Sequence, residues 1–138
     1  MPKRSRYQSH CGFGGSFGGI QTLVAAEGGL GAQALIAFGP GAKSWGNGVL
    51  RERLENAVRN AKGPVFVLQA NNDFSVEPAN VLGKIAKTNG GQAEVYPAFG
   101  NNSRDGHWGF ATTNSGIEVW QKDVLDLINS TFVKSLRP

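Results

Sequence analysis

Gly14-Gly15-Ser16-Phe17-Gly18 fits the pattern G-x-S-x-G, in which a serine occupies a tight turn between a strand and a helix. Bulky side chains would collide beside such a turn, so glycine is required at the flanking positions. The turn lifts the Ser16 hydroxyl above the sheet, and the backbone N–H of Phe17 can face a developing oxyanion. Because glycine makes up 20 of the 138 residues, an ordinary loop is the alternative interpretation of this pattern, and the rest of the sequence is needed to distinguish the two.

The remainder of the chain alternates between helical and extended patterns. The run 64–70 is apolar on both faces, which is typical of a central strand in a parallel sheet. Helices are predicted over 20–27, 50–61, about 78–89 and from about 117 onward, and strands over 34–38, 64–70 and 93–99. This alternation predicts the α/β class, with a parallel sheet and helices on both of its faces.

Length and composition favour a single domain. Residues 1–138 are long enough for one core, and 1–9 are expected to form a polar N-terminal tail. The sequence has no apolar run of membrane-spanning length and no visible signal peptide. Its single cysteine, Cys11, cannot form an internal disulfide and suits a reducing compartment. A cytoplasmic location away from the membrane is therefore expected.

The formal net charge of +4 raises the question of nucleic-acid binding. Three of the fourteen basic residues, Lys3, Arg4 and Arg6, lie within the first six positions, and the others are scattered. A nucleic-acid-binding surface would show a basic stripe interleaved with aromatic residues, and none is present. Cysteine and histidine residues do not cluster as metal ligands do. We therefore expect no nucleic acid and no metal.

A serine hydroxyl needs a base beside it, oriented by a third group, before it can act as a nucleophile. Only His10 and His107 are available, and His107 lies in a polar, glycine-punctuated loop after the last predicted strand. Asp73 follows the strongest predicted strand and is the candidate acid. Asp105 competes, but it precedes the histidine by two positions and is poorly placed to hold the far ring nitrogen. Taken singly, a turn-capping aspartate and a surface-loop histidine are the alternatives.

Three segments carry a specific resemblance. They read Gly15-Ser16-Phe17-Gly18-Gly19, Leu68-Gln69-Ala70-Asn71-Asn72-Asp73 and Asp105-Gly106-His107-Trp108-Gly109-Phe110. These segments look like the motif regions of the dienelactone hydrolase-like branch of the α/β-hydrolases, and the similarity runs from about residue 14 to the C-terminal helix. The order serine, aspartate, histidine is also the order of that fold.

The resemblance implies a role for each of the three residues. Ser16 would be the nucleophile, Asp73 the orienting acid and His107 the general base, acting on an ester-type bond. The tight turn that holds the serine is called the nucleophile elbow. Dienelactone hydrolases carry cysteine at this elbow, whereas this chain has serine there and Cys11 lies outside the motif. The resemblance therefore implies a serine esterase mechanism on a small-molecule ester, without a metal or cofactor.

The sequence departs from the family before the elbow. Members of the fold have several strands there, whereas only about a dozen residues precede the elbow here, so a truncated α/β-hydrolase fold is expected. The elbow strand would then be an exposed sheet edge able to self-associate. The loop that usually supplies the second oxyanion donor would be missing. Two functions follow: a serine hydrolase, or an inactive remnant that acts as a binding or subunit-interface module.

Aromatic residues flank the predicted strand ends. Trp45, Phe74 and Trp108 are candidates for a substrate pocket, and Phe110 lies nearby. Ordinary core packing of these large rings is the alternative.

Overall fold

The computed structural model describes residues 11–27 and 34–136. They form a four-stranded sheet in which the strands follow the order β1-β2-β3-β4 and each neighbouring pair is parallel. The strands are β1 (Cys11–Gly15), β2 (Ala34–Phe38), β3 (Val65–Ala70) and β4 (Gln92–Tyr96). Because parallel strands all point the same way, their carboxyl ends meet at one end of the sheet.

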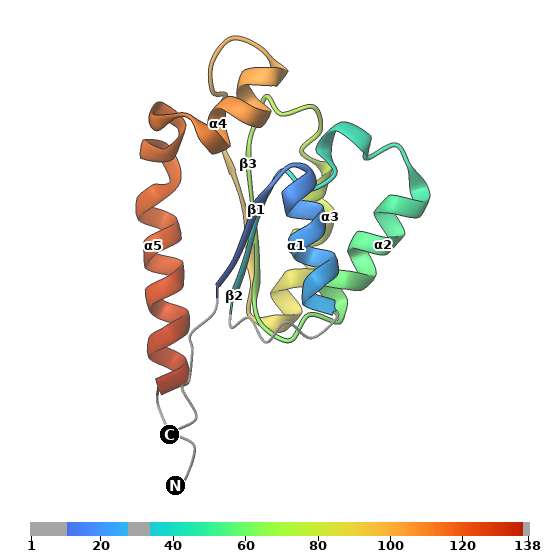
Figure 1. Ribbon diagram of the computed structural model, residues 1–138, viewed down its shortest axis with the longest axis vertical. Coiled ribbons are helices and arrows are strands. Elements are labelled where there is room, and N and C mark those ends of the chain that lie inside the picture. Colours follow the sequence, from blue (N-terminus) through green and yellow to red (C-terminus); the bar gives the residue numbers. More distant parts are fainter. Residues whose placement is uncertain (1–10, 28–33, 137–138) are drawn as a thin grey trace, which may run out of the picture.

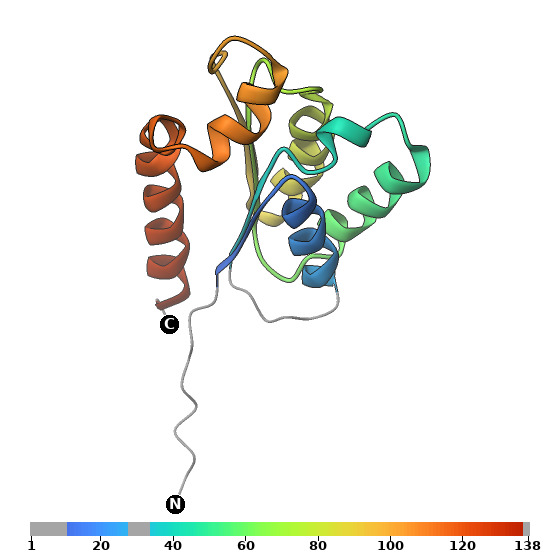
Figure 2. The same ribbon diagram turned by 45° about the horizontal axis from the view of Figure 1, so that its top comes forward.

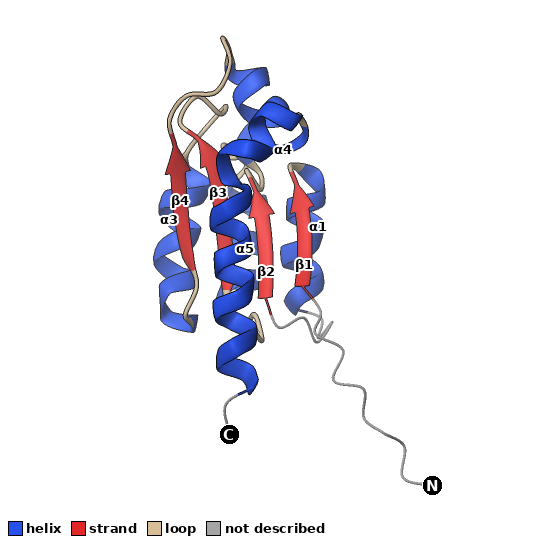
Figure 3. Cartoon of the chain, turned by 90° about the vertical axis from the view of Figure 1, so that its left-hand side faces the viewer, coloured by secondary structure: helices blue, strands red, loops and turns tan. Residues whose placement is uncertain are grey.

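Helices cover both faces of this sheet (Figure 1). One face carries α1 (Phe17–Glu27), α2 (Gly48–Arg59) and α3 (Glu77–Ala86), and the other carries α5 (Asn114–Leu136), which follows the short α4 (Phe110–Thr112). Figure 3 looks at the sheet from the side of α5. The predicted class, a parallel sheet between helical layers, is confirmed. Within the described ranges, no helix combines the length and apolarity needed to cross a membrane.

The sheet divides the core into two clusters. β2 and β3 are buried along their whole length, and their side chains alternate between the two faces. The cluster toward α1, α2 and α3 includes Leu35, Ala37, Val65, Val67, Leu54 and Leu82. The cluster toward α5 includes Ile36, Phe38, Phe66, Leu68, Phe110 and Trp120. The two central strands are therefore fixed between packed layers, and the loops that leave their ends start from fixed positions.

Local chemistry sets several boundaries. The Asn47 side chain caps α2 by accepting hydrogen bonds from two backbone N–H groups of its first turn. Pro78 occupies the first turn of α3, as predicted, because a proline lacks the N–H that would be unpaired there. The strand predicted over 93–99 ends earlier, at Tyr96, because Pro97 cannot donate a ladder hydrogen bond.

Other predicted boundaries were also wrong. α1 begins at Phe17 and α5 at Asn114, each three residues before the predicted start, and the loop after β4 contains the helical turn Asp105–Gly109. Apolar periodicity does not mark these segments, because glycine and polar residues dominate them and tertiary contacts impose the helix. The tail predicted over 1–9 and His10 lie outside the described residues.

Candidate active site

Three side chains singled out from the sequence follow three strand ends at the same end of the sheet. Ser16 directly follows β1, Asp73 lies in the turn after β3, and His107 lies in the helical turn after β4. Figure 2 brings this end of the molecule toward the viewer. Loops at the carboxyl ends of parallel strands are where α/β proteins form their sites.

The structure joins these three side chains by hydrogen bonds. Ser16 Oγ lies 2.7 Å from His107 Nε2, and His107 Nδ1 lies 2.7 Å from Asp73 Oδ1. An ionised carboxylate only accepts, so Nδ1 carries the proton and Nε2 accepts from the serine hydroxyl. The competing acid, Asp105, instead accepts a hydrogen bond from the backbone N–H of Asn101 at 2.9 Å. The imidazole therefore pairs with Asp73, which agrees with the order of residues in the sequence.

The backbone at the serine is strained. Ser16 has a φ of 53° and is the one non-glycine residue with a positive φ in the described ranges. Its N–H donates to Phe38 O at 2.8 Å, and its carbonyl accepts from Ile20 N at 3.1 Å. A Cβ at Gly14 would collide with the Gly18 carbonyl, whereas a Cβ at Gly18 would meet open space. Glycine is therefore required at position 14 for a steric reason, as predicted. The prediction that position 18 also requires glycine was wrong.

The backbone N–H of Phe17 is the sequence-based candidate for an oxyanion donor. Phe17 is the first residue of α1, directly after the serine. The first N–H groups of a helix have no partner inside the helix, and the helix dipole favours negative charge at this end. The position therefore suits the role that the sequence predicts.

Aromatic and cationic side chains surround the imidazole. The rings of Phe74 and Trp108 lie 5.3 and 4.9 Å from that of His107, and 41% and 37% of these two residues is exposed. Lys43 Nζ lies 5.6 Å from the Phe74 ring and 5.2 Å from the Trp108 ring. Arg104 Cζ lies 5.7 Å from the Trp108 ring. These four residues (Lys43, Phe74, Arg104 and Trp108) form an aromatic and positively charged rim beside Ser16, His107 and Asp73.

Trp45 does not belong to this rim. It is buried in the core cluster that also holds Leu54 and Ala57, and Phe110 is buried in the cluster toward α5. For these two rings the packing alternative holds, while Phe74 and Trp108 remain candidates for contact with a substrate.

No protein-family profile and no curated protein sequence matches this chain. Solved structures do. An esterase of Pyrococcus furiosus is 13% identical with a TM-score of 0.62, and the match covers 90% of this chain and 54% of that one. Thermogutta terrifontis esterase 2 with bound propionate is 20% identical with a TM-score of 0.54, over 91% and 56%. The acylaminoacyl peptidase of Pyrococcus horikoshii is 13% identical with a TM-score of 0.52, over 69% and 20%.

The chain has the α/β-hydrolase fold. At these identities the similarity shows the fold alone, and it does not assign the activity of the esterases or the peptidase to this chain. The chain spans 54% to 56% of the length of the esterases and 20% of the peptidase. The four strands described above therefore correspond to a part of a larger hydrolase-fold sheet.

Three residues that surround Asp73 and His107 were missed from the sequence. Gln69 donates to Asp73 Oδ2 at 2.8 Å, and Gly39 leaves room beside the acid and the imidazole. The Asn72 side chain donates hydrogen bonds to Phe99 O at 2.7 Å and Asn102 O at 2.9 Å, and its oxygen accepts one from Phe99 N at 2.8 Å. These bonds connect the turn that holds Asp73 to the loop that leads to His107. The amide-rich segment Gln69-Ala70-Asn71-Asn72 was the signal for Gln69 and Asn72, and it is a weak one because amide side chains are common in turns for purely local reasons. No pattern in the sequence marked Gly39.

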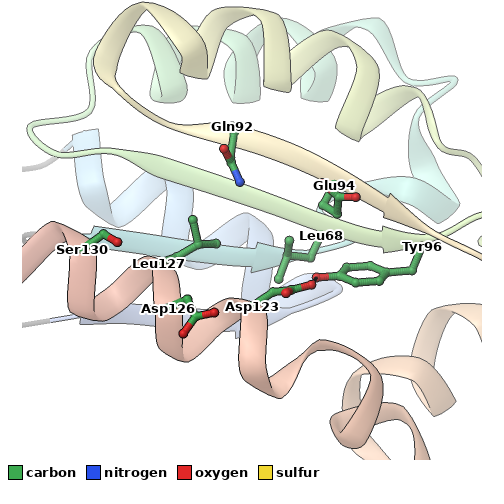
Figure 4. Close-up of a pocket in the computed structure, with 8 residues that line it drawn as sticks. All are labelled: Leu68, Gln92, Glu94, Tyr96, Asp123, Asp126, Leu127 and Ser130. Atoms are coloured by element: carbon green, nitrogen blue, oxygen red, sulfur yellow. Dashed lines mark hydrogen bonds between the residues drawn. The ribbon is translucent and has the colours of Figure 1, made fainter.

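A separate pocket lies away from the triad (Figure 4). It has a volume of about 360 Å³ and is formed between β4 and α5, with Glu94, Tyr96, Asp123 and Asp126 in its lining. Tyr96 donates its hydroxyl to Asp123 Oδ2 at 2.7 Å. Burial, and then this carboxylate, raise the pKa of Tyr96 above the ordinary range for tyrosine. No group of three or more histidine, cysteine or acidic residues suited to a metal ion occurs in the part of the chain that the structure describes.

Proposed function

We propose that this chain is a serine hydrolase that cleaves ester-type bonds through Ser16, His107 and Asp73. One observation carries the proposal: an unbroken series of hydrogen bonds runs from the serine hydroxyl to the buried carboxylate. The strained turn that holds the serine supports it, since such strain is concentrated at functional positions.

In this proposal, His107 Nε2 takes the hydroxyl proton as Ser16 Oγ attacks the carbonyl carbon of the ester. The carbonyl oxygen becomes an oxyanion, toward which the Phe17 N–H donates. His107 then returns the proton to the leaving alcohol oxygen, and an acyl-serine remains. Water attacks the acyl carbon and gives a proton to Nε2. The bond between the acyl carbon and Ser16 Oγ then breaks, Nε2 returns the proton to Oγ, and the acid is released. Asp73 accepts the hydrogen bond from the Nδ1–H throughout and stabilises the imidazolium.

The rim indicates which esters suit this site. Lys43 and Arg104 bring positive charge to the mouth of the site, and Phe74 and Trp108 bring flat apolar surface. A carboxylesterase or dienelactone hydrolase-like activity on a small ester agrees with these groups. An ester whose acyl part carries a carboxylate would be attracted to the two cations and is the preferred substrate in this proposal.

A second function follows from the length of the match. The chain spans little more than half of the esterases, so the second oxyanion donor would have to come from polypeptide outside the matched part. The loss of one such donor reduces turnover on the order of a hundredfold or more. A catalytically inactive hydrolase remnant that binds a ligand or another subunit is therefore the alternative.

Hydrolysis of activated esters by the purified chain tests both functions. We expect turnover that falls at least about a thousandfold in Ser16→Ala and in His107→Ala, because each removes a member of one catalytic unit. Ser115→Ala, at an exposed position of α5, is the matched control and keeps full activity. A 4-nitrophenyl hemisuccinate should be preferred over a 4-nitrophenyl butyrate, and this preference should fall as salt is added.

A fluorophosphonate probe provides a readout independent of turnover. Labelling of the wild type that disappears in Ser16→Ala would support a working nucleophile. If a folded wild-type sample shows no labelling and no turnover, the proposed hydrolase function is contradicted and the inactive remnant is favoured.

A further inference from the structure

Gln69 is the most buried polar residue of the described part of the chain. Only three polar or charged residues there are buried, namely Gln69, Asp73 and His107, and their exposures are 1%, 8% and 5%. Two of these three belong to the proposed triad. A buried amide has to be hydrogen-bonded to be tolerated, so its partners reveal what it is held against.

The hydrogen bonds of Gln69 fix the orientation of its amide group. The backbone N–H of Ala79 can only donate, and it lies 2.8 Å from Oε1. The backbone carbonyl of Ser75 can only accept, and it lies 2.8 Å from Nε2. The NH₂ group therefore faces the acid, and its second hydrogen is donated to Asp73 Oδ2 at 2.8 Å. No other assignment of oxygen and nitrogen satisfies all three partners.

The carboxylate of Asp73 is held from two sides. The backbone N–H of Phe74 donates to Oδ1 at 2.7 Å, and this same oxygen accepts from His107 Nδ1. Oδ2 is reached by Gln69. Rotation of a carboxylate about its last side-chain bond is otherwise only weakly restricted, so a donor at each oxygen is needed to fix its plane.

We propose that Gln69 is a positioning residue of the triad, acting through Asp73. This inference rests on the proposed function for its catalytic meaning. Gln69 lies in β3, between two packed layers, and its amide group also forms hydrogen bonds with Ser75, just before α3, and with Ala79, in the first turn of α3. It therefore ties the plane of the carboxylate to the strand and to the helix. With Oδ2 held in this way, Oδ1 is directed at the imidazole before any substrate binds.

The test uses two substitutions at Gln69. Gln69→Glu keeps an acceptor for the Ala79 N–H and replaces the donating NH₂ with an oxygen, whereas Gln69→Met keeps the length and removes both polar atoms. Both should lower kcat about 10- to 100-fold while KM changes less than about twofold, because the acid–base pair is misplaced and substrate contacts are untouched. Val58→Ala is the matched control: Val58 is buried in the same core layer, and its truncation should lower Tm without changing kcat.

A spectroscopic readout separates this inference from the proposed function. The proton on His107 Nδ1 should give a low-field NMR resonance that is retained in Val58→Ala and shifted or lost in both Gln69 variants. Loss of this resonance only in the Gln69 variants supports the positioning role, even if the chain hydrolyses no ester. If Gln69→Met matches Val58→Ala in both kcat and the resonance, the positioning role is overturned, and the proposed hydrolase function stands or falls on the Ser16 variant. If one Gln69 variant fails to fold, the other gives the same comparison.

Discussion

Gly39 shapes the space in which the acid and the imidazole meet. It follows β2 with a φ of +50°, and its N–H donates to Leu68 O at 3.1 Å. A Cβ at this position would lie 2.6 Å from Asp73 Oδ2 and 3.1 Å from His107 Nδ1. Both the conformation and the lack of a side chain are therefore required here, since a left-handed φ favours glycine and the acid–base pair fills the adjacent volume.

Alanine substitution can separate these two requirements. Gly39→Ala should lose about 1–2 kcal/mol of unfolding free energy through its backbone, together with a further loss from the collision. Ester hydrolysis should fall on the order of a hundredfold, because the acid is displaced from the imidazole. Gly90→Ala is the control, since Gly90 has a φ of +80° with open space around it. It should share the backbone effect and keep full activity.

Urea unfolding and ester turnover, measured on both variants, check this prediction. A Gly39→Ala enzyme as active as Gly90→Ala would contradict the idea that this glycine makes room for the triad.

At the scale of elements, β4 and α5 are joined by a buried phenol. Tyr96, the last residue of β4, donates to Asp123 of α5 and is 8% exposed. Burial, followed by the neighbouring carboxylate, raises the pKa of Tyr96. The folded state thus favours the protonated phenol, and deprotonation would place two negative charges side by side in a partly buried site.

This shift has a direct consequence for stability in alkali. The contribution of Tyr96 is fully present below the unfolded-state pKa of about 10 and is lost as the pH rises through the higher folded-state pKa. The wild type should therefore lose unfolding free energy between about pH 10 and about pH 12. Tyr96→Phe should lose less over this interval, because it has no proton to release. Urea unfolding at several pH values measures the slope, and equal slopes in the two proteins would exclude Tyr96 as the cause.

The elements also differ in how well the sequence predicted them. β3 is apolar on both faces, and the middle of α5 carries apolar residues at helical spacing, so composition and spacing identify them. The serine that precedes α1 bonds to Phe38 at the end of β2, and His107 of the helical turn Asp105–Gly109 bonds to Asp73 after β3. Spacing along the sequence cannot show such contacts. The three side chains that the structure joins were predictable because Ser16 lies in the G-x-S-x-G pattern and Asp73 and His107 each follow a predicted strand. Gln69 was not, because within β3 it reads as one polar residue of a buried strand.

For the whole molecule, α5 covers the sheet unevenly. In Figure 3 the helix runs in front of β2 and β3, while β1 lies to one side. Phe13, on β1, packs against Phe38 and Trp120 with tilted rings whose centroids lie 5.2 and 5.9 Å apart, yet 52% of it is exposed. In the described part of the chain β1 pairs with β2 alone, so its other edge is open. An open edge beside an exposed aromatic ring favours pairing with another chain.

We therefore expect the purified chain to self-associate, with a mass in sedimentation equilibrium that rises with concentration in the micromolar range. Burying the exposed half of Phe13 in a second molecule would stabilise association by about 1 kcal/mol, in addition to new backbone hydrogen bonds. Phe13→Lys should abolish association, since a charged side chain on an edge strand opposes pairing. Val49→Lys removes an apolar side chain that is 81% exposed on α2 and should leave association unchanged. If the wild type stays monomeric, or if Phe13→Lys and Val49→Lys change association equally, the β1 edge does not drive assembly.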